Sequence, residues 1–450
     1  MAQASAAFTK LRAEVEELTS AIEAQQLVLR GLMTKRSKAR RQMNNLFLDP
    51  MARLPFELQS QIFILVPLNP NPGVYPPDPP KPAPNAPPMA FLGVCRLWRE
   101  IALATRQLWA GILMDSLPRG PNYIELSKTW LGRARNLPLS LKLSGRLNLG
   151  QSVQDLITHY RHQLEDLTLT FPLSYLNRSD LLHQVLVLDL DDASPLSALK
   201  TLTLESTDEE VNFTSMGKWL NILRAAPGLL SCSVSKAWFR HQEEGLQPLT
   251  LASLTELRLG EPYGWMMVGD SASSCTMLRY LTLPALKSLT LSVLDITNEE
   301  FFAFLTRSSP PLESFDMAVP DGWNNVIVTR CLGLMPSLAS LKLIAAPTDI
   351  ELYTPFLDVL ATDRELLPNL RELQLRTDCP VTIDYNKVLR MITFRFTACP
   401  KRLEKFELDW AQQERDFTPD LPDEPVRAAM RQLAKDGLHL RLGHFWAESL

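Results

Sequence analysis

The sequence predicts an α/β protein in three parts: an N-terminal helix or short coiled coil, a small helical domain, and an irregular solenoid of parallel strands and helices. Three observations support this prediction. Apolar residues follow a heptad spacing in residues 7–45. Two apolar stretches with a helical repeat flank a proline-rich stretch in residues 50–113. A leucine phrase then recurs through residues 123–447, and the 450 residues are too many for one compact core.

The first part carries apolar residues at alternating spacings of four and three. The positions are Leu11, Val15, Leu18, Ile22, Gln25, Leu29 and Leu32. This spacing keeps one seam on one side of a helix. A homodimeric coiled coil and a single helix packed on its own domain both satisfy the pattern. In a dimer, Gln25 would weaken the pairing of the helices but fix their register.

A basic run follows at the end of this helix, formed by Lys35, Arg36, Lys38, Arg40 and Arg41. One interpretation is a nuclear-localisation or phosphate-binding patch. The other is a set of solvated cations, favoured near a helix C-terminus by the helix dipole. The second interpretation is favoured because no aromatic residue interleaves the charges.

The second part, residues 50–113, contains more apolar surface than a domain of its size needs to cover itself, which predicts a partner surface. Pro55 suits the first turn of a helix, where its missing N–H costs nothing. Leu58, Ile62 and Leu65 then lie on one helical face, with Phe63 beside it. After the prolines, Val94, Trp98 and Ile101 follow a second helical repeat.

These stretches carry a resemblance to a known family. Leu54-Pro55-x-Glu57-Leu58-x-x-x-Ile62-Phe63, followed by Val94-Cys95-Arg96-x-Trp98-Arg99-x-Ile101-Ala102 and Leu108-Trp109, resembles the F-box. More narrowly, it is similar to the F-box-like proteins of mushroom-forming fungi. The resemblance implies a three-helix motif that binds a Skp-type adaptor and, through it, a cullin ubiquitin ligase. The implied adaptor-binding residues are Leu54, Pro55, Leu58, Ile62, Phe63, Val94, Trp98, Ile101 and Trp109.

The match departs from the family pattern in two places. An insertion at residues 67–88 contains eleven prolines, which predict an extended, partly polyproline II loop. Such a loop could bind an SH3 or WW domain, but a tolerated surface insertion is the favoured interpretation. The Thr-Pro pair that usually precedes the final Leu-Trp is replaced by Thr105-Arg106-Gln107. Both departures spare the apolar anchors.

The third part opens with a predicted helix at residues 123–135 and repeats one phrase, a Leu, two residues, then Leu-x-Leu. Clear copies end at residues 204, 259, 291, 343 and 375. Both leucines of Leu-x-Leu project from the same face of a short strand, and stacked units share one core. This part resembles irregular leucine-rich repeats. The Asn or Cys usual three positions after Leu-x-Leu is mostly absent, so the backbone hydrogen-bond ladder that it supplies is not predicted.

The positions that alternate with the leucines face outward from the predicted concave strand surface. They are candidates for contact with an unknown protein substrate. Their mixed charges and low apolar content suit a protein better than a lipid, a nucleic acid or a small apolar ligand. The candidates are Thr203, Arg258, Thr290, Asp316, Lys342, Gln374 and Glu407.

Composition narrows the remaining classes. A net charge of −4 gives no field for nucleic acid or an anionic membrane. We find no secretory signal pattern and no apolar run long enough for a bilayer. The six scattered cysteines contain no C-x-x-C, which argues against disulfides and a zinc site and for a reducing compartment, the cytoplasm or the nucleus.

No catalytic motif or cofactor-binding glycine loop is present, so the sequence predicts no enzyme, no metal and no cofactor. His159 and His162 could share a helical face but have no third ligand at matching spacing. Three hypotheses follow. The first is a substrate-recruiting F-box adaptor. The second is an F-box and leucine-rich-repeat scaffold without a role in degradation. The third is a hydrolase with a cryptic site in the concave face.

Overall fold

A computed structural model describes most of the chain. The described residues are 2–47, 51–65, 88–115, 123–144, 151–171, 195–206, 212–214, 216–235, 237–240, 245–260, 271–291, 296–319, 325–345, 353–377, 384–397, 402–410, 422–443 and 445–446. Contacts divide the chain into two compact units. The first comprises Met1–Pro67 with Pro87–Leu108, and the second continues from Trp109 to Leu450. The proline-rich insertion predicted at residues 67–88 lies outside the described residues apart from Pro88.

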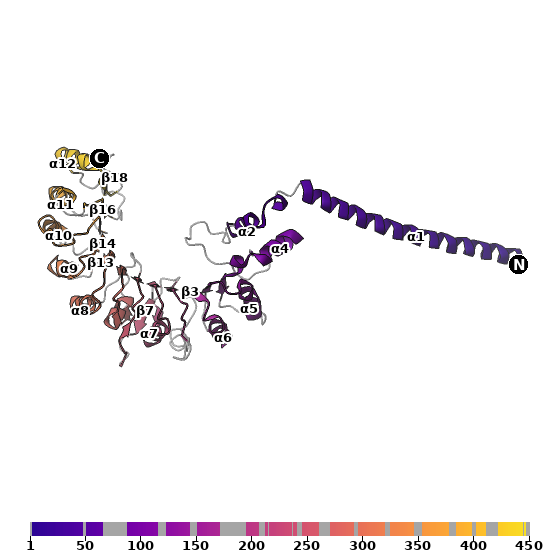
Figure 1. The fold of residues 1–450 in the computed structure, drawn as a ribbon, viewed down its shortest axis with the longest axis horizontal. Coiled ribbons are helices and arrows are strands. Elements are labelled where there is room, and N and C mark those ends of the chain that lie inside the picture. The colour runs from indigo at the N-terminus through magenta and orange to yellow at the C-terminus, as the bar shows by residue number, and fades with distance from the viewer. Residues whose placement is uncertain are drawn as a thin grey trace. The chain divides into compact units, whose positions relative to one another are not determined.

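The first unit is helical (Figure 1). Its elements are α1 (Ala2–Phe47), a 3-10 turn η1 (Met51–Arg53), α2 (Phe56–Leu65), α3 (Met89–Val94), α4 (Arg96–Ala104) and a 3-10 turn η2 (Arg106–Trp109). A cluster of three aromatic rings forms the core between α2, α3 and α4. The centroid of Phe63 lies 4.5 Å from that of Phe91 and 5.1 Å from that of Trp98.

Polar contacts fix the ends of these short helices. The N–H of Trp98 donates to Cys95 Sγ at 3.5 Å, so Cys95 caps the start of α4. At the other end, Thr105 Oγ1 donates to Ser60 Oγ at 2.9 Å and ties α4 to α2. The buried Gln59 donates to the carbonyl of Met51 at 2.6 Å, which holds η1 against α2. These bonds position the face of α2 that does not enter the core.

The second unit is a mixed α/β structure built on one large sheet (Figure 1). Twelve of its strands are parallel and neighbour one another in chain order, and a thirteenth, β18, closes one edge in antiparallel orientation. The strands are β1 (Gly111–Asp115), β2 (Leu139–Ser144), β3 (Leu164–Phe171), β4 (Thr201–Ser206), β6 (Ser231–Ser235), β9 (Glu256–Leu259), β12 (Ser288–Leu291), β13 (Ser314–Ala318), β14 (Ser340–Ala345), β15 (Glu372–Thr377), β16 (Lys405–Trp410), β17 (His439–Leu442) and β18 (Phe445–Trp446). This order is what stacked strand–helix repeats produce.

Helices connect many of these strands and lie along one side of the sheet (Figure 1). They are α5 (Tyr123–Ala134), α6 (Gln151–Tyr160), α7 (Met216–Ala225), α8 (Asn298–Ser308), α9 (Asn325–Leu332), α10 (Tyr353–Leu360), α11 (Tyr385–Thr397) and α12 (Glu424–Lys435). A 3-10 helix, η4 (Ser274–Arg279), occupies the connection before β12. Two small sheets complete the unit, one of β5 (Asn212–Thr214), β7 (Ala237–Arg240) and β10 (Ser271–Ser273), the other of β8 (Leu249–Thr250) and β11 (Leu281–Thr282).

The leucines of the repeated phrase form the core between the sheet and its helices. Leu202 and Leu204 of β4 are 0% and 1% exposed, and Leu341 and Leu343 of β14 are 1% and 0% exposed. The residues between them are only half-buried, which is the alternation expected of strands with one covered face. The predicted arrangement of Leu-x-Leu is confirmed.

A backbone ladder joins neighbouring repeats at the entry to each strand. The carbonyl of Lys287 accepts from the N–H groups of Glu313 and Ser314 at 2.8 and 2.9 Å. The carbonyl of Glu313 accepts in turn from Ala339 and Ser340, at 2.8 and 3.0 Å. The same pattern, one carbonyl accepting from two successive N–H groups, repeats from the carbonyl of Lys200 before β4 to that of Arg371 before β15. The main chain thus supplies a ladder where the side-chain amides of regular repeats are missing.

Trp109 changes the boundary between the second and third predicted parts. Its ring is completely buried and meets Trp130 of α5 edge-on, with centroids 5.1 Å apart. Strand β1 then pairs with β2, so residues 111–115 belong to the sheet. The repeat unit therefore begins at Trp109, before the predicted start at residue 123 and inside the predicted helical domain of residues 50–113. The predicted helix at residues 123–135 is confirmed as α5.

Candidate functional site

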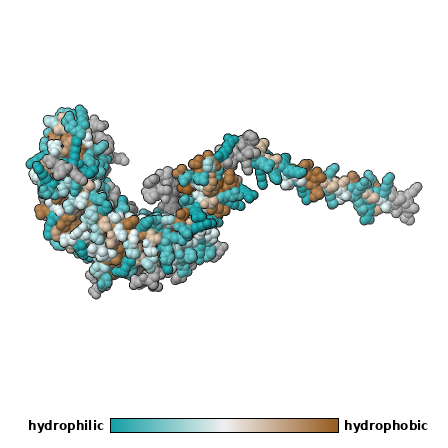
Figure 2. Space-filling view, in the orientation of Figure 1, coloured by the Kyte–Doolittle hydropathy of each residue, from teal (hydrophilic) through white to brown (hydrophobic). Residues whose placement is uncertain are grey.

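The first candidate surface is an apolar face on α2. Leu58, Ile62 and Leu65 are 51%, 40% and 76% exposed, while Phe63 on the opposite side is 1% exposed. Helix α2 is therefore apolar on both sides, and only one side is covered by its own unit. Val94 at the end of α3 and Leu103 on α4 add further exposed apolar side chains, at 57% and 44%. Figure 2 shows hydrophobic residues gathered on this helical unit.

The structure separates the nine predicted adaptor-binding residues into two groups. Pro55, Leu58, Ile62 and Val94 are exposed, and Leu54 and Trp98 are half-buried. The remaining three are buried in this structure. Phe63 and Ile101 are each 1% exposed within the helical unit, and Trp109 lies under Arg133 and against Trp130 in the repeat unit.

Two exposed apolar residues were missed as candidates. Phe56 is 46% exposed at the first position of α2, and Leu103 is 44% exposed on α4. Neither lies on the helical face that carried the predicted candidates. Phe56 precedes the core residue Phe63 by seven residues, and Leu103 follows the charged Arg96 by seven. Leu65 is different: it follows Leu58 by seven residues, and this spacing already placed it on the apolar face.

The second candidate surface is the side of the sheet opposite the helices, which we call the open face. All seven predicted substrate residues lie in one register row across it. Arg258 pairs with Thr290, Thr290 with Asp316, and Asp316 with Lys342. Lys342 then pairs with Gln374, and Gln374 with Glu407. Thr203 joins the row through Ser233 of β6.

The row continues beyond the predicted residues at both ends. Lys142 and Thr168 precede Thr203, and Arg441 follows Glu407. Eleven strands from β2 to β17 therefore contribute one side chain each. At about 4.8 Å between strands, the row is about 50 Å long when measured along the sheet. This length exceeds what a small-molecule pocket needs and suits a protein partner.

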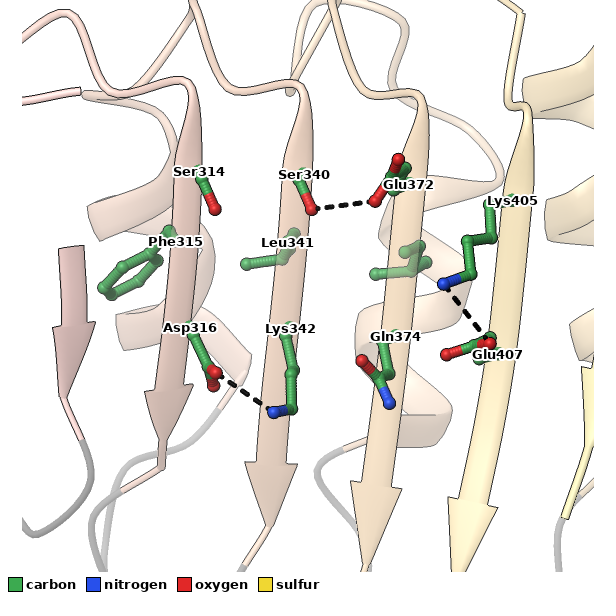
Figure 3. Close-up of a pocket in the computed structure, with 11 residues that line it drawn as sticks. Ser314, Phe315, Asp316, Ser340, Leu341, Lys342, Glu372, Gln374, Lys405 and Glu407 are labelled. Carbon is green, nitrogen blue, oxygen red and sulfur yellow. Dashed lines mark hydrogen bonds and ion pairs between the residues drawn. The ribbon is translucent and has the colours of Figure 1, made fainter. Parts of the chain in front are cut away.

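Ion pairs fix the charged end of the open face (Figure 3). Lys342 Nζ lies 3.0 Å from Asp316 Oδ2, and both side chains are about four-fifths buried, at 21% and 23% exposure. Glu407, only 9% exposed, receives Arg441 Nε at 3.4 Å and Lys405 Nζ at 3.3 Å. These charges stand in defined positions before any partner arrives, so a complementary surface would lose little side-chain entropy in docking.

Hydroxyl groups line the neighbouring row, two residues nearer the start of each strand. Ser340 Oγ donates to Glu372 Oε2 at 3.3 Å, and Ser231 Oγ donates to Glu256 Oε2 at 3.1 Å. Ser314, Ser340 and Lys342 line a pocket with Gln374 and Glu407 (Figure 3). The open face is therefore a polar surface that carries hydroxyl, carboxylate, amide and cationic groups.

We searched the described residues for metal-binding clusters and for reactive thiols. No group of three or more His, Cys, Asp or Glu side chains there could hold a metal ion. Burial raises the pKa of the Cys232 thiol to about 12 and that of Cys331 to about 11, which disfavours a reactive thiolate at either position. Within the same residues, no helix combines the length and apolar character needed to cross a membrane.

Comparison with known proteins gives no further guide to these two surfaces. No protein-family model matches the chain, and no curated protein is significantly similar to it.

Proposed function

We propose that this chain is a non-catalytic F-box adaptor. Its helical unit would bind a Skp-type protein and, through it, a cullin ubiquitin ligase. Its leucine-rich-repeat unit would hold a protein substrate on the open face. The chain would act in the cytoplasm or the nucleus by raising the concentration of that substrate near the ligase.

One observation carries the proposal. The two motif positions Leu58 and Ile62 are exposed, although their neighbour Phe63 anchors the core. Exposed apolar side chains on a short helix with a fully formed core on its other side are typical of a partner surface. Burying them in an interface recovers about 25 cal/mol for each Å² of apolar area removed from water.

The open face supports the second half of the proposal. Its row of side chains carries Asp316, Lys342, Glu407 and Arg441 in paired, partly buried positions. Mixed and fixed charges of this kind favour selection among protein partners through electrostatic complementarity. This row and the row two residues nearer the start of each strand together carry five cations and five carboxylates. The open face therefore has no excess of either sign and is not suited to the phosphate backbone of a nucleic acid.

The test is co-purification of the full chain with a Skp-type protein and a cullin. The double variant Leu58→Glu and Ile62→Glu places two charges on the apolar face without touching the core. We expect the affinity for the Skp-type protein to fall by about a hundredfold, since two buried apolar anchors are lost.

Arg96→Glu is the matched control, because it adds the same acidic side chain to the same unit at a position that is 93% exposed. Its recovery of both partners should equal that of the unaltered chain. If the double variant also retains both partners, the proposed site is wrong. If the Skp-type protein is recovered without a cullin, the chain is a scaffold rather than a ligase subunit.

A further inference from the structure

Helix α1 carries an apolar stripe that the other described residues leave exposed. At about 1.5 Å per residue, its 46 residues are about 69 Å long. Every residue from 8 to 43 is exposed. The stripe residues are 54–70% exposed, namely Phe8, Leu11, Val15, Leu18, Ile22, Leu29 and Leu32. No other described residue of the chain covers this stripe, which leaves it open to a partner helix.

A second copy of α1 has the matching shape, because a 3.5-residue stripe is buried best by another such stripe. The two relative directions of the helices differ in charge. Residues 8–24 contain four glutamates and two cations, whereas residues 25–43 contain six cations and no carboxylate. A parallel pair would bring the two basic halves together and place Arg36 opposite Arg36 inside the seam. Like charges at such distances destabilise the pair.

We propose that two copies of the chain pair through α1 in antiparallel orientation. Residues 8–22 of each copy then lie along residues 25–39 of the other. Leu18 faces Leu29, Val15 faces Leu32, and the large Phe8 faces the small Ala39 of the second copy. Ile22 meets Gln25 at the centre, so the polar residue sets the register. Glu14, which flanks the seam, lies beside Lys35 of the second copy and forms an ion pair on each side of the centre.

This proposal does not depend on the proposed adaptor role. The apolar pattern alone does not choose the direction of the helices, because Val15 and Ile22 alternating with leucines would also suit a parallel pair. The charge distribution decides the direction. Opposite halves attract in the antiparallel arrangement and like halves repel in the parallel one.

Disulfide cross-linking distinguishes the two directions. The full chain with Cys95, Cys379 and Cys399 replaced by Ser serves as background, because Cys95 is exposed and the other two lie outside the described residues. Ser at position 95 retains the helix-capping role. Leu18→Cys and Leu29→Cys are made separately in this background. We expect a covalent dimer when the two variants are mixed and oxidised, and none from Leu18→Cys alone. A dimer from Leu18→Cys alone would establish the parallel arrangement and overturn the proposal, as would a monomeric mass for the unaltered chain in light scattering.

A charge exchange gives a second readout that does not use cysteine. Lys35→Glu should raise the dimer Kd by about tenfold, because both ion pairs become like-charge contacts. Adding Glu14→Lys should restore the original Kd. Lys38→Glu makes the same charge change on the outer side of the helix and should alter the Kd far less. In a parallel dimer Lys35 lies near Arg40, so Lys35→Glu would strengthen the pairing, and that result would also overturn the proposal.

Discussion

At the scale of single residues, two arginines each donate to several main-chain carbonyls of the segment that precedes their helix. Arg395 of α11 is 1% exposed and donates to the carbonyls of Leu360, Asp363 and Leu366 at 2.8–2.9 Å. The same loop contains Leu367 in the left-handed region, with φ of 54°. The exposed Arg307 of α8 makes similar bonds to the segment before its own helix, donating to the carbonyl of Leu278 at 2.8 Å. The buried guanidinium of Arg395 is tolerated because it satisfies several carbonyls at once.

We expect Arg395→Met to lower the free energy of unfolding by about 3 kcal/mol, since it leaves several buried carbonyls without donors. Urea unfolding followed by circular dichroism measures this loss. Arg390→Met is the matched control, because Arg390 lies on the same helix and is exposed. Equal stability of the two variants would show that the buried hydrogen bonds contribute nothing net.

At the scale of elements, α2 has two apolar sides with different roles. Phe63 contacts the rings of Phe91 and Trp98 and holds the three helices together. Leu58 lies on the other side and is half exposed. Shortening Phe63 should therefore affect folding, whereas shortening Leu58 should affect binding.

Phe63→Ala should destabilise the helical unit by about 3–5 kcal/mol, as expected when a buried aromatic ring is removed. Leu58→Ala should change its stability by less than about 1 kcal/mol, since its side chain has few packing partners to lose. Hydrogen exchange in peptides that cover residues 88–104, followed as denaturant is added, reports on the stability of this unit. A large loss of stability in Leu58→Ala would contradict the assignment of this residue to a docking surface.

The elements also show how far the sequence alone could predict the structure. The spacing of the leucines predicted the strands, and therefore placed Thr203 to Glu407 in one row on one side of the sheet. Trp109 was predicted in the helical domain but lies in the second unit. A sequence motif shows which residues recur, and it does not show which core they enter. The two-donor backbone ladder was not predictable either, since main-chain groups carry no sequence signal. The exposure of Leu58 beside the buried Phe63 depends on how α2 packs on α3 and α4, which follow it only after residues 66–88.

At the scale of the whole molecule, each unit offers a surface of a different chemistry. The helical unit offers apolar side chains on α2, and the repeat unit offers paired charges and hydroxyls on the open face. Apolar anchors contribute chiefly to affinity, whereas fixed charges contribute chiefly to selectivity. This division fits a chain that keeps one constant partner and selects another.

Hydrogen exchange of the full chain, with and without a Skp-type protein, tests the central claim most directly. We expect slower exchange in peptides that cover residues 56–65 and unchanged exchange in β13 to β16. Binding through the adaptor surface would leave the open face free for a substrate. Protection of β13 to β16 with no change in residues 56–65, or no protection anywhere, would contradict the account.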